Sequence, residues 1–245
     1  MPAFFINSTE IHEKHITLTG DLCHHLQASL RVTLGEILWL TDERRRRYRV
    51  EVSEQTQQSL TVSILDQQEA PSAAGPALLL VQAILKGDHM DWVVQKASEL
   101  GVQTIVPLVA RRGVVRPQPD RIAAQRARWQ RIAVEAAQQS EQWQPPQVTD
   151  PVEWRTYLAA LPAPCSLILT ERREAMALHR MRLPEDPMQS LALIIGPEGG
   201  WSEEEVSLAV GAGCQAVGLG PMILRAETAA LAAVSIVQSR LGRLG

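Results

Sequence analysis

Two glycine-containing turns near the C-terminus are the residues most suited to binding a ligand. The run 196–200 reads Gly-Pro-Glu-Gly-Gly and follows five apolar residues, 191–195; a second turn, Gly220-Pro221, follows the short apolar run 216–219. Consecutive glycines bare the backbone, so another molecule can approach it closely. Beyond the second turn, Arg225 and Glu227 place a charged pair where a small apolar helix begins. A tight turn is the simpler interpretation of one such run, but together they favour a ligand site.

Clustered arginines form the second group with a recognisable chemistry. Five of them fall within 44–49, on one predicted hairpin, and seven more are spread over 111–131. The planar guanidinium matches phosphate bidentately better than a lysine ammonium does. The first cluster therefore predicts phosphate contacts with a nucleic acid, whereas a solvated surface remains an open alternative for the second.

Composition narrows the function classes. The chain has 245 residues, a net charge of −3 and three scattered cysteines without metal-ligand spacing, so no metal site is predicted. Neither G-x-G-x-x-G nor G-x-x-x-x-G-K-[ST] occurs, which weakens dinucleotide and triphosphate interpretations. The N-terminus lacks the features of a signal peptide, and no apolar run approaches the ~20 residues of a membrane span. We therefore expect a soluble, cytoplasmic protein that does not contact a membrane.

Strands and helices are predicted to alternate through the C-terminal part of the chain, residues 77–245, and this alternation positions the turns. Strands are expected at 77–85, 104–109, 166–170, 191–195 and 216–219, with helices at about 88–100, 120–139, 203–213 and 226–241. Ser202 and Glu205 form a capping box at the third helix. The pattern predicts a mainly parallel sheet with helices on both faces and a ligand at the carboxyl ends of its strands.

The N-terminal part, residues 1–70, is predicted to be mostly β. Alternating residues at 47–52 and 60–65, an apolar run at 36–40 and a turn at Thr41-Asp42 suit a small barrel that carries the arginines on a surface turn. A short helix is expected at 24–31. The run 67–76, QQEAPSAAGP, is predicted to link the two domains.

Taken together, these residues resemble the SPOUT class of RNA methyltransferases. The resemblance lies in Ile195–Gly200, Leu219-Gly220, Ile223–Ala229, Lys86-Gly87 with Gln95–Gly101, Glu135–Ala137, and Phe4-Phe5, His25 and Leu30-Arg31. Within that class the chain is similar to the family that methylates N3 of uridine 1498 in 16S ribosomal RNA. The run Gln138–Gln142 departs from the family pattern, which usually has an acidic residue first and an arginine near the end.

The resemblance implies properties that residue patterns alone do not supply. It implies a deep trefoil knot in the parallel-sheet domain, a PUA-like N-terminal β-barrel, and a homodimer with active sites near the subunit interface, acting on 16S rRNA of the 30S subunit. The implied cofactor is S-adenosylmethionine, bound by Leu169, Thr170, Glu171, Ile195, Gly196, Pro197, Glu198, Gly199, Gly200, Leu219, Gly220, Ile223, Leu224, Thr228 and Ala229. RNA contacts are expected from Arg31, Arg44, Arg45, Arg46, Arg47, Arg49, Arg111 and Arg112.

Arg225 is the predicted catalytic residue. Uridine N3 becomes a nucleophile when it loses its proton, and an arginine beside the cofactor loop can stabilise the charge that spreads onto the carbonyl oxygens. A structural salt bridge from Arg225 to Glu227 or Glu198 is the alternative, and no general base is evident. Two other functions stay open: a non-catalytic RNA-binding factor in ribosome assembly, and a SPOUT enzyme that acts on tRNA or on the ribose 2′-hydroxyl.

Overall fold

The computed structural model describes residues 3–72, 75–171 and 175–244. They divide into two compact units: residues 3–72 and 137–145 form the first, and residues 75–136, 146–171 and 175–244 form the second. Residues 137–145 therefore fold with the first unit, although they lie inside the range 77–245 predicted for the second domain.

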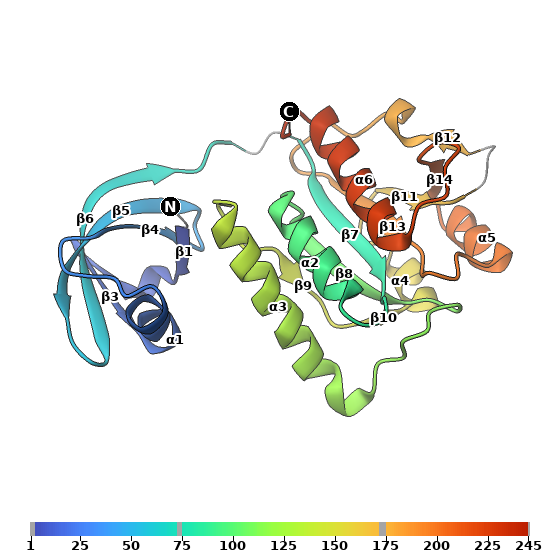
Figure 1. Cartoon of the computed structure of the whole chain (residues 1–245). Helices are drawn as coiled ribbons and strands as arrows, with labels where there is room; N and C mark the ends of the chain where they lie inside the picture. The colour runs from blue at the N-terminus through green and yellow to red at the C-terminus, as the bar shows by residue number, and fades with distance from the viewer. Residues whose placement is uncertain (1–2, 73–74, 172–174, 245) are drawn as a thin grey trace. The chain divides into compact units, whose positions relative to one another are not determined.

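A parallel sheet forms the centre of the second unit (Figure 1). Among the described residues it has eight strands, in the order β10-β8-β7-β13-β11-β14-β12 with β9 beside β8, and the recorded pairs are parallel. The strands are β7 (Ala77–Ala83), β8 (Thr104–Val109), β9 (Gln147–Val148), β10 (Val152–Glu153), β11 (Cys165–Leu169), β12 (Met176–Ala177), β13 (Ser190–Ile195) and β14 (Gln215–Gly218). The predicted α/β class with a parallel sheet is confirmed.

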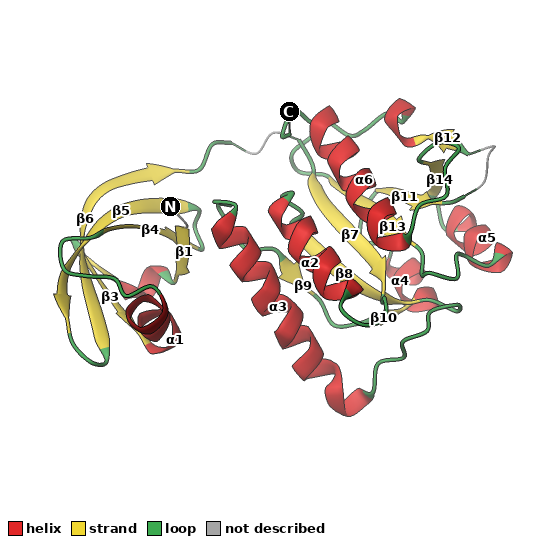
Figure 2. Cartoon of the chain, viewed as in Figure 1, coloured by secondary structure: helices red, strands yellow, loops and turns green. Residues whose placement is uncertain are grey.

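Helices cover both faces of this sheet, as Figure 2 shows. They are α2 (His89–Glu99), α3 (Ile122–Gln139), α4 (Trp154–Ala160), α5 (Glu203–Gly211) and α6 (Ala226–Arg240), with short 3-10 turns at Pro119–Arg121 and Leu178–Arg180. Leu80 of β7 lies in the core cluster that includes α2, α3 and α6, whereas Val81, the next residue, lies in the cluster that includes α4 and α5. Because both faces are buried, the central strands β7, β8, β11 and β13 are mostly apolar. Helix α4 was not predicted from the sequence.

The first unit is built on a mixed sheet. Within the described residues its six strands have the order β1-β4-β5-β6-β3-β2, with β1 parallel to β4 and the other recorded pairs antiparallel. The strands are β1 (Ala3–Ile6), β2 (Ile11–His12), β3 (His15–Thr19), β4 (Ile37–Asp42), β5 (Arg46–Gln55) and β6 (Ser59–Glu69), with helical turns at Ser8–Glu10, α1 (Gly20–His24) and His25–Ser29. The predicted linker therefore begins later than expected, because residues 67–69 still belong to β6.

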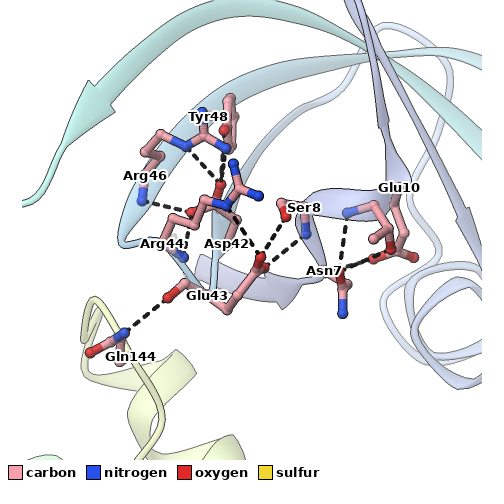
Figure 3. Close-up of polar contacts among 10 residues, drawn as sticks. Asn7, Ser8, Glu10, Asp42, Glu43, Arg44, Arg46, Tyr48 and Gln144 are labelled. Atoms are coloured by element: carbon pink, nitrogen blue, oxygen red, sulfur yellow. Dashed lines mark hydrogen bonds and ion pairs between the residues drawn. The ribbon is translucent and has the colours of Figure 1, made fainter.

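The turn predicted at Thr41-Asp42 is wrong, because both residues are buried at the end of β4 and the chain turns at 43–45. Figure 3 shows why Asp42 tolerates burial. Its Oδ1 accepts hydrogen bonds from the backbone amides of Arg44 and Arg46 at 3.0 and 2.8 Å. Its Oδ2 accepts hydrogen bonds from the Arg46 guanidinium at 2.8 and 2.9 Å and from the Tyr48 hydroxyl at 3.0 Å. A buried carboxylate with so many donors holds the β4–β5 turn in one shape.

Arg47 explains why residues 137–145 belong to the first unit. Its Nη2 donates to the carbonyl oxygens of Glu141 and Gln142, at 2.9 and 3.2 Å, and its guanidinium lies 4.1 Å from the ring centre of Trp143. Burial lowers the pKa of Arg47. Near this contact, the Gln144 side chain donates to the carbonyl oxygen of Glu43 at 3.1 Å (Figure 3). These contacts fasten the segment after α3 to the β4–β5 hairpin.

Because of the Tyr48 hydroxyl, the stability of the first unit is expected to fall at alkaline pH. Burial, together with the hydrogen bond to Asp42, raises the pKa of Tyr48 to about 12. Because the folded state holds this proton more tightly than the unfolded chain, the stabilisation is complete below pH ~10 and is lost as the pH rises toward ~12. We expect a loss of roughly 2 kcal/mol across this window, measured as the free energy of unfolding. Tyr48→Phe is expected to remove this contribution. Equal pH slopes for the two proteins would contradict it.

Candidate active site

Three neighbouring strands bring most of the predicted ligand-binding residues to one edge of the sheet. β13, β11 and β14 are adjacent and parallel, so the loops after Ile195, Leu169 and Gly218 leave from the same edge. The loops are tied to each other and to their neighbours: the Thr170 amide donates to the Val217 carbonyl at 2.8 Å, and the Trp201 indole Nε1 donates to the Leu169 carbonyl at 3.0 Å. The predicted residues Thr228 and Ala229 lie on the first turn of α6, which follows the third loop.

The glycines of these loops have two different roles. Gly200 and Gly220 have positive φ angles of 66° and 113°, and a methyl group added at either would meet no described atom within 4 Å. Their backbone is therefore open to a ligand. Gly196 and Gly199 are packed against protein instead, because an added Cβ would lie 3.0 Å from the Trp201 indole and 3.2 Å from Arg112, respectively. Arg112 therefore fills the space on the Cβ side of Gly199, and a ligand contact of the Gly199 backbone stays a prediction.

Thr170 carries a polar atom that needs a partner. Its hydroxyl oxygen is buried, lies just beyond the end of β11, and has no hydrogen bond among the described residues. A buried hydroxyl without a partner is uncommon, because it loses its hydrogen bonds to water on folding. A bound molecule with a polar edge would satisfy it.

Glu198 is used by the protein itself. Its Oε1 accepts a hydrogen bond from the Lys86 backbone amide at 3.0 Å, which ties the loop after β13 to the loop after β7. This exposed carboxylate therefore holds two loops together through an amide hydrogen bond.

Arg225 is free to act on a ligand. Its side chain is exposed and has no hydrogen-bond or ion-pair partner within the described parts of the chain. The predicted alternative, a salt bridge to Glu227 or Glu198, does not form, because Glu227 lies 3.3 Å from His89 Nδ1 and Glu198 binds the Lys86 amide. The backbone of Arg225 is extended and its carbonyl accepts the Ala229 amide at 2.8 Å, so it stands at the entry to α6. The sequence does not indicate that His89 pairs with Glu227.

The arginines predicted to bind RNA divide into engaged and available side chains. Arg46 and Arg47 are engaged inside the first unit, with Asp42 and with residues 141–143. Arg45, at φ 62°, donates to the Pro71 carbonyl at 3.3 Å. The side chains of Arg31, Arg44 and Arg49 are exposed, and of these Arg44 has a long 3.8 Å ion pair with Glu43. The exposed three are the better candidates for contacts outside the chain.

Arg111 and Arg112, also predicted to bind RNA, contact the loop after β13 and the start of α5. Arg111 pairs with Glu204 at 2.8 Å, and its backbone amide donates to Glu205 at 2.8 Å. The Arg112 Nη1 donates to the carbonyl oxygens of Gly199 and Trp201, at 3.3 Å each. These bonds connect the loop after β8 with the loop after β13. Both side chains remain exposed.

The described residues contain no group of three or more histidine, cysteine or carboxylate side chains placed to hold a metal ion. In the same part of the chain, no helix is long and apolar enough to cross a membrane.

Comparison with known proteins finds close similarity over nearly the whole chain. A family profile described as an RNA methyltransferase domain matches residues 73–238. The ribosomal RNA small subunit methyltransferase E of Synechocystis sp. is 32% identical, over 95% of this chain and 75% of its own length.

Solved structures give the same result. The ribosomal RNA small subunit methyltransferase E of Neisseria gonorrhoeae, bound to S-adenosylmethionine, is 32% identical with a TM-score of 0.86 over 98% of both chains. A Legionella pneumophila protein described as a methyltransferase, in complex with the same cofactor, is 30% identical with a TM-score of 0.87 over 97% of both chains.

Proposed function

Because this chain belongs to the RNA methyltransferase domain family, we propose that it methylates small-subunit ribosomal RNA with S-adenosylmethionine as methyl donor. The observation that carries the proposal is the edge formed by β13, β11 and β14: its loops carry open backbone and an unsatisfied hydroxyl, and the loop after β14 leads to Arg225 at the start of α6. Relatives with the same fold at 30% and 32% identity bind this cofactor, which supports the same use of the edge here.

The residues at this edge fit the cofactor. Open backbone at Gly200 and Gly220 suits the close approach of a planar base, and the buried Thr170 hydroxyl suits a polar atom of the nucleoside. The other predicted contacts lie at the ends of these strands, in the loops that follow them and on the first turn of α6, at Leu169, Glu171, Ile195–Gly199, Leu219, Ile223, Leu224, Thr228 and Ala229. When bound, S-adenosylmethionine supplies a sulfonium methyl group that leaves sulfur as the new bond to the nucleophile forms.

We propose N3 of the uridine equivalent to 1498 in 16S rRNA as the methylated atom, and Arg225 as the catalytic residue. Loss of the N3 proton spreads negative charge onto the two uracil carbonyl oxygens. A guanidinium with no partner among the described residues can donate to such an oxygen without first breaking a salt bridge. His89 keeps the Glu227 carboxylate occupied and so leaves Arg225 available.

We also propose a trefoil knot, a homodimer and an RNA-binding barrel. A trefoil knot is supported by the chain path, since β14 lies on the far side of β11 from β13 and the following α6 packs back on β13 and α2. The strongly exposed Met222 and Ile223 beside the small residues of α6 support a homodimer. We propose that the mixed sheet of the first unit is a PUA-like barrel that contacts RNA in the 30S subunit, and that the protein acts in the cytoplasm.

The test of this function is nucleoside mapping. Small subunits from a strain that lacks the protein are incubated with the purified protein and S-adenosylmethionine, and the modified nucleosides are located by mass spectrometry. We expect one new 3-methyluridine in 16S rRNA. A product on tRNA or a ribose 2′-hydroxyl would replace the proposed target, and a protein that binds RNA but neither binds the cofactor nor methylates would be an assembly factor.

Salt dependence separates the available arginines from the engaged ones. Replacing Arg44 and Arg49 with alanine is expected to weaken RNA binding and to reduce the slope of log K against log salt by about one for each phosphate that is no longer bound. Arg155→Ala, which removes an exposed arginine of α4 paired with Glu204, serves as the matched control. Equal slopes for all three proteins would show that the hairpin arginines only face solvent.

A further inference from the structure

The loop 196–201, proposed above to receive the cofactor, owes its shape to the tryptophan that ends it. Trp201 follows Gly200, whose positive φ of 66° turns the chain back, and the Gly200 amide closes the turn on the Pro197 carbonyl at 2.9 Å. The turn brings the indole ring onto the start of the loop, where a Cβ at Gly196 would lie 3.0 Å from Nε1 and 3.1 Å from Cε2. Gly196 must therefore be glycine because the indole covers its backbone.

The same indole reaches a second loop. Its Nε1 donates to the Leu169 carbonyl at 3.0 Å, and Leu169 is the last residue of β11. Trp201 therefore joins the loop after β13 to the strand end that carries Thr170, across the site where the cofactor is proposed to bind. A half-buried hydrogen bond between two loops fixes their spacing, which neither loop could do alone.

Two further contacts hold the indole in place. The ring centre of the buried Trp154 lies 4.9 Å from that of Trp201, and Arg112 donates to the carbonyl oxygens of Gly199 and Trp201 at 3.3 Å each. The Trp154 Nε1 is buried without a partner among the described residues, so Trp154 contacts Trp201 through ring packing alone. The orientation of Trp201 is thus set before any ligand arrives.

We propose that Trp201 is a positioning residue that holds the loops after β11 and β13 at the spacing the cofactor needs, through its Nε1–Leu169 hydrogen bond. This inference rests on the proposed cofactor site. Preorganisation of this kind improves affinity because the ordering of the loops is completed before binding. It therefore acts on cofactor affinity and leaves the methyl-transfer step itself unchanged.

The test compares Trp201→Phe with Trp92→Phe, an exposed tryptophan of α2, since each removes one indole N–H but, among the described residues, only the Trp201 N–H has a partner. Calorimetric titration with S-adenosylmethionine is expected to show about three- to tenfold weaker binding for Trp201→Phe, because one hydrogen bond is removed, and wild-type binding for Trp92→Phe. KM for the cofactor should rise by the same factor in Trp201→Phe, with kcat at saturating cofactor within about twofold of wild type.

Hydrogen exchange tests, without any ligand, whether Trp201 holds the two loops together. In Trp201→Phe the amides of Gly200 and Thr170 should exchange faster. The exchange rate of the Cys214 amide, which donates to the carbonyl of Ala209 in α5, should not change. Unchanged exchange and unchanged affinity in Trp201→Phe would overturn the inference while the proposed function stands. Faster exchange in Trp201→Phe, together with a wild-type protein that does not bind the cofactor, would support the role of Trp201 in holding the two loops and overturn the proposed function.

Discussion

Arg225→Ala is expected to slow methylation by about a hundredfold or more under single-turnover conditions. One preorganised donor to a developing oxyanion contributes about 10²–10³ in rate when the site is otherwise intact. The Arg225 guanidinium makes no hydrogen bond or ion pair within the described chain, so its removal leaves no unpaired group behind there. Arg225→Lys should recover only part of the rate, because a point charge does not reproduce the planar fork.

The measurement is single-turnover methylation of isolated 30S subunits beside equilibrium binding of each ligand. Cofactor and RNA affinities should change far less than the rate. His89→Ala is a matched probe, because it would free the Glu227 carboxylate two residues from Arg225 and is expected to lower the rate by a smaller factor. If saturating cofactor restores the rate of Arg225→Ala, the residue only holds the cofactor and its catalytic role is wrong.

Asp42→Ala is expected to destabilise the first unit by about 3 kcal/mol, the range found when one partner of a buried ion pair is removed. The substitution leaves the Arg46 guanidinium, the Tyr48 hydroxyl and two backbone amides without their acceptor. Arg46 keeps partial contact with water, which limits the loss to the lower end of that range. Native-state hydrogen exchange of β5 amides reports this unit separately from the rest of the chain.

Asp66→Ala is the control for Asp42→Ala, because Asp66 is an exposed aspartate on the neighbouring β6. Its loss should change stability by less than about 0.5 kcal/mol. Equal exchange rates in the two variants would mean that Asp42 contributes no more than a surface carboxylate. Cofactor affinity should not change in either variant.

Much of the second unit could be predicted because its signals are local. The capping box at Ser202 and Glu205 forms as expected, and the strands expected at 104–109 and 191–195 occur within a residue of those limits. Asp42 was misjudged for a physical reason: aspartate commonly forms turns, and its burial depends on Arg46 and Tyr48, which reach it only after the hairpin closes.

The candidate site was predicted in its position but not in its internal contacts. Strand-end loops with glycine were visible in the sequence, and parallel pairing brings them together. Gly199 packs against Arg112 of another loop, and Gly196 packs against Trp201 at the far end of its own loop. No pattern of neighbouring residues in the sequence indicates either contact. Helix α4 is short and lacks a side-chain cap, so its sequence offered little periodic signal.

Because residues 137–145 belong to the first unit, this unit cannot be completed as soon as residues 1–72 have been synthesised. A nascent chain that has emerged only to Ser72 has all six strands but lacks Trp143 and the carbonyl groups that Arg47 binds. At ~5–20 residues per second, the missing segment follows roughly 4–15 seconds later, after residues 73–136 of the second unit have been made and before residues 146–245. The N-terminal unit therefore reaches its final form during translation of the unit that follows it.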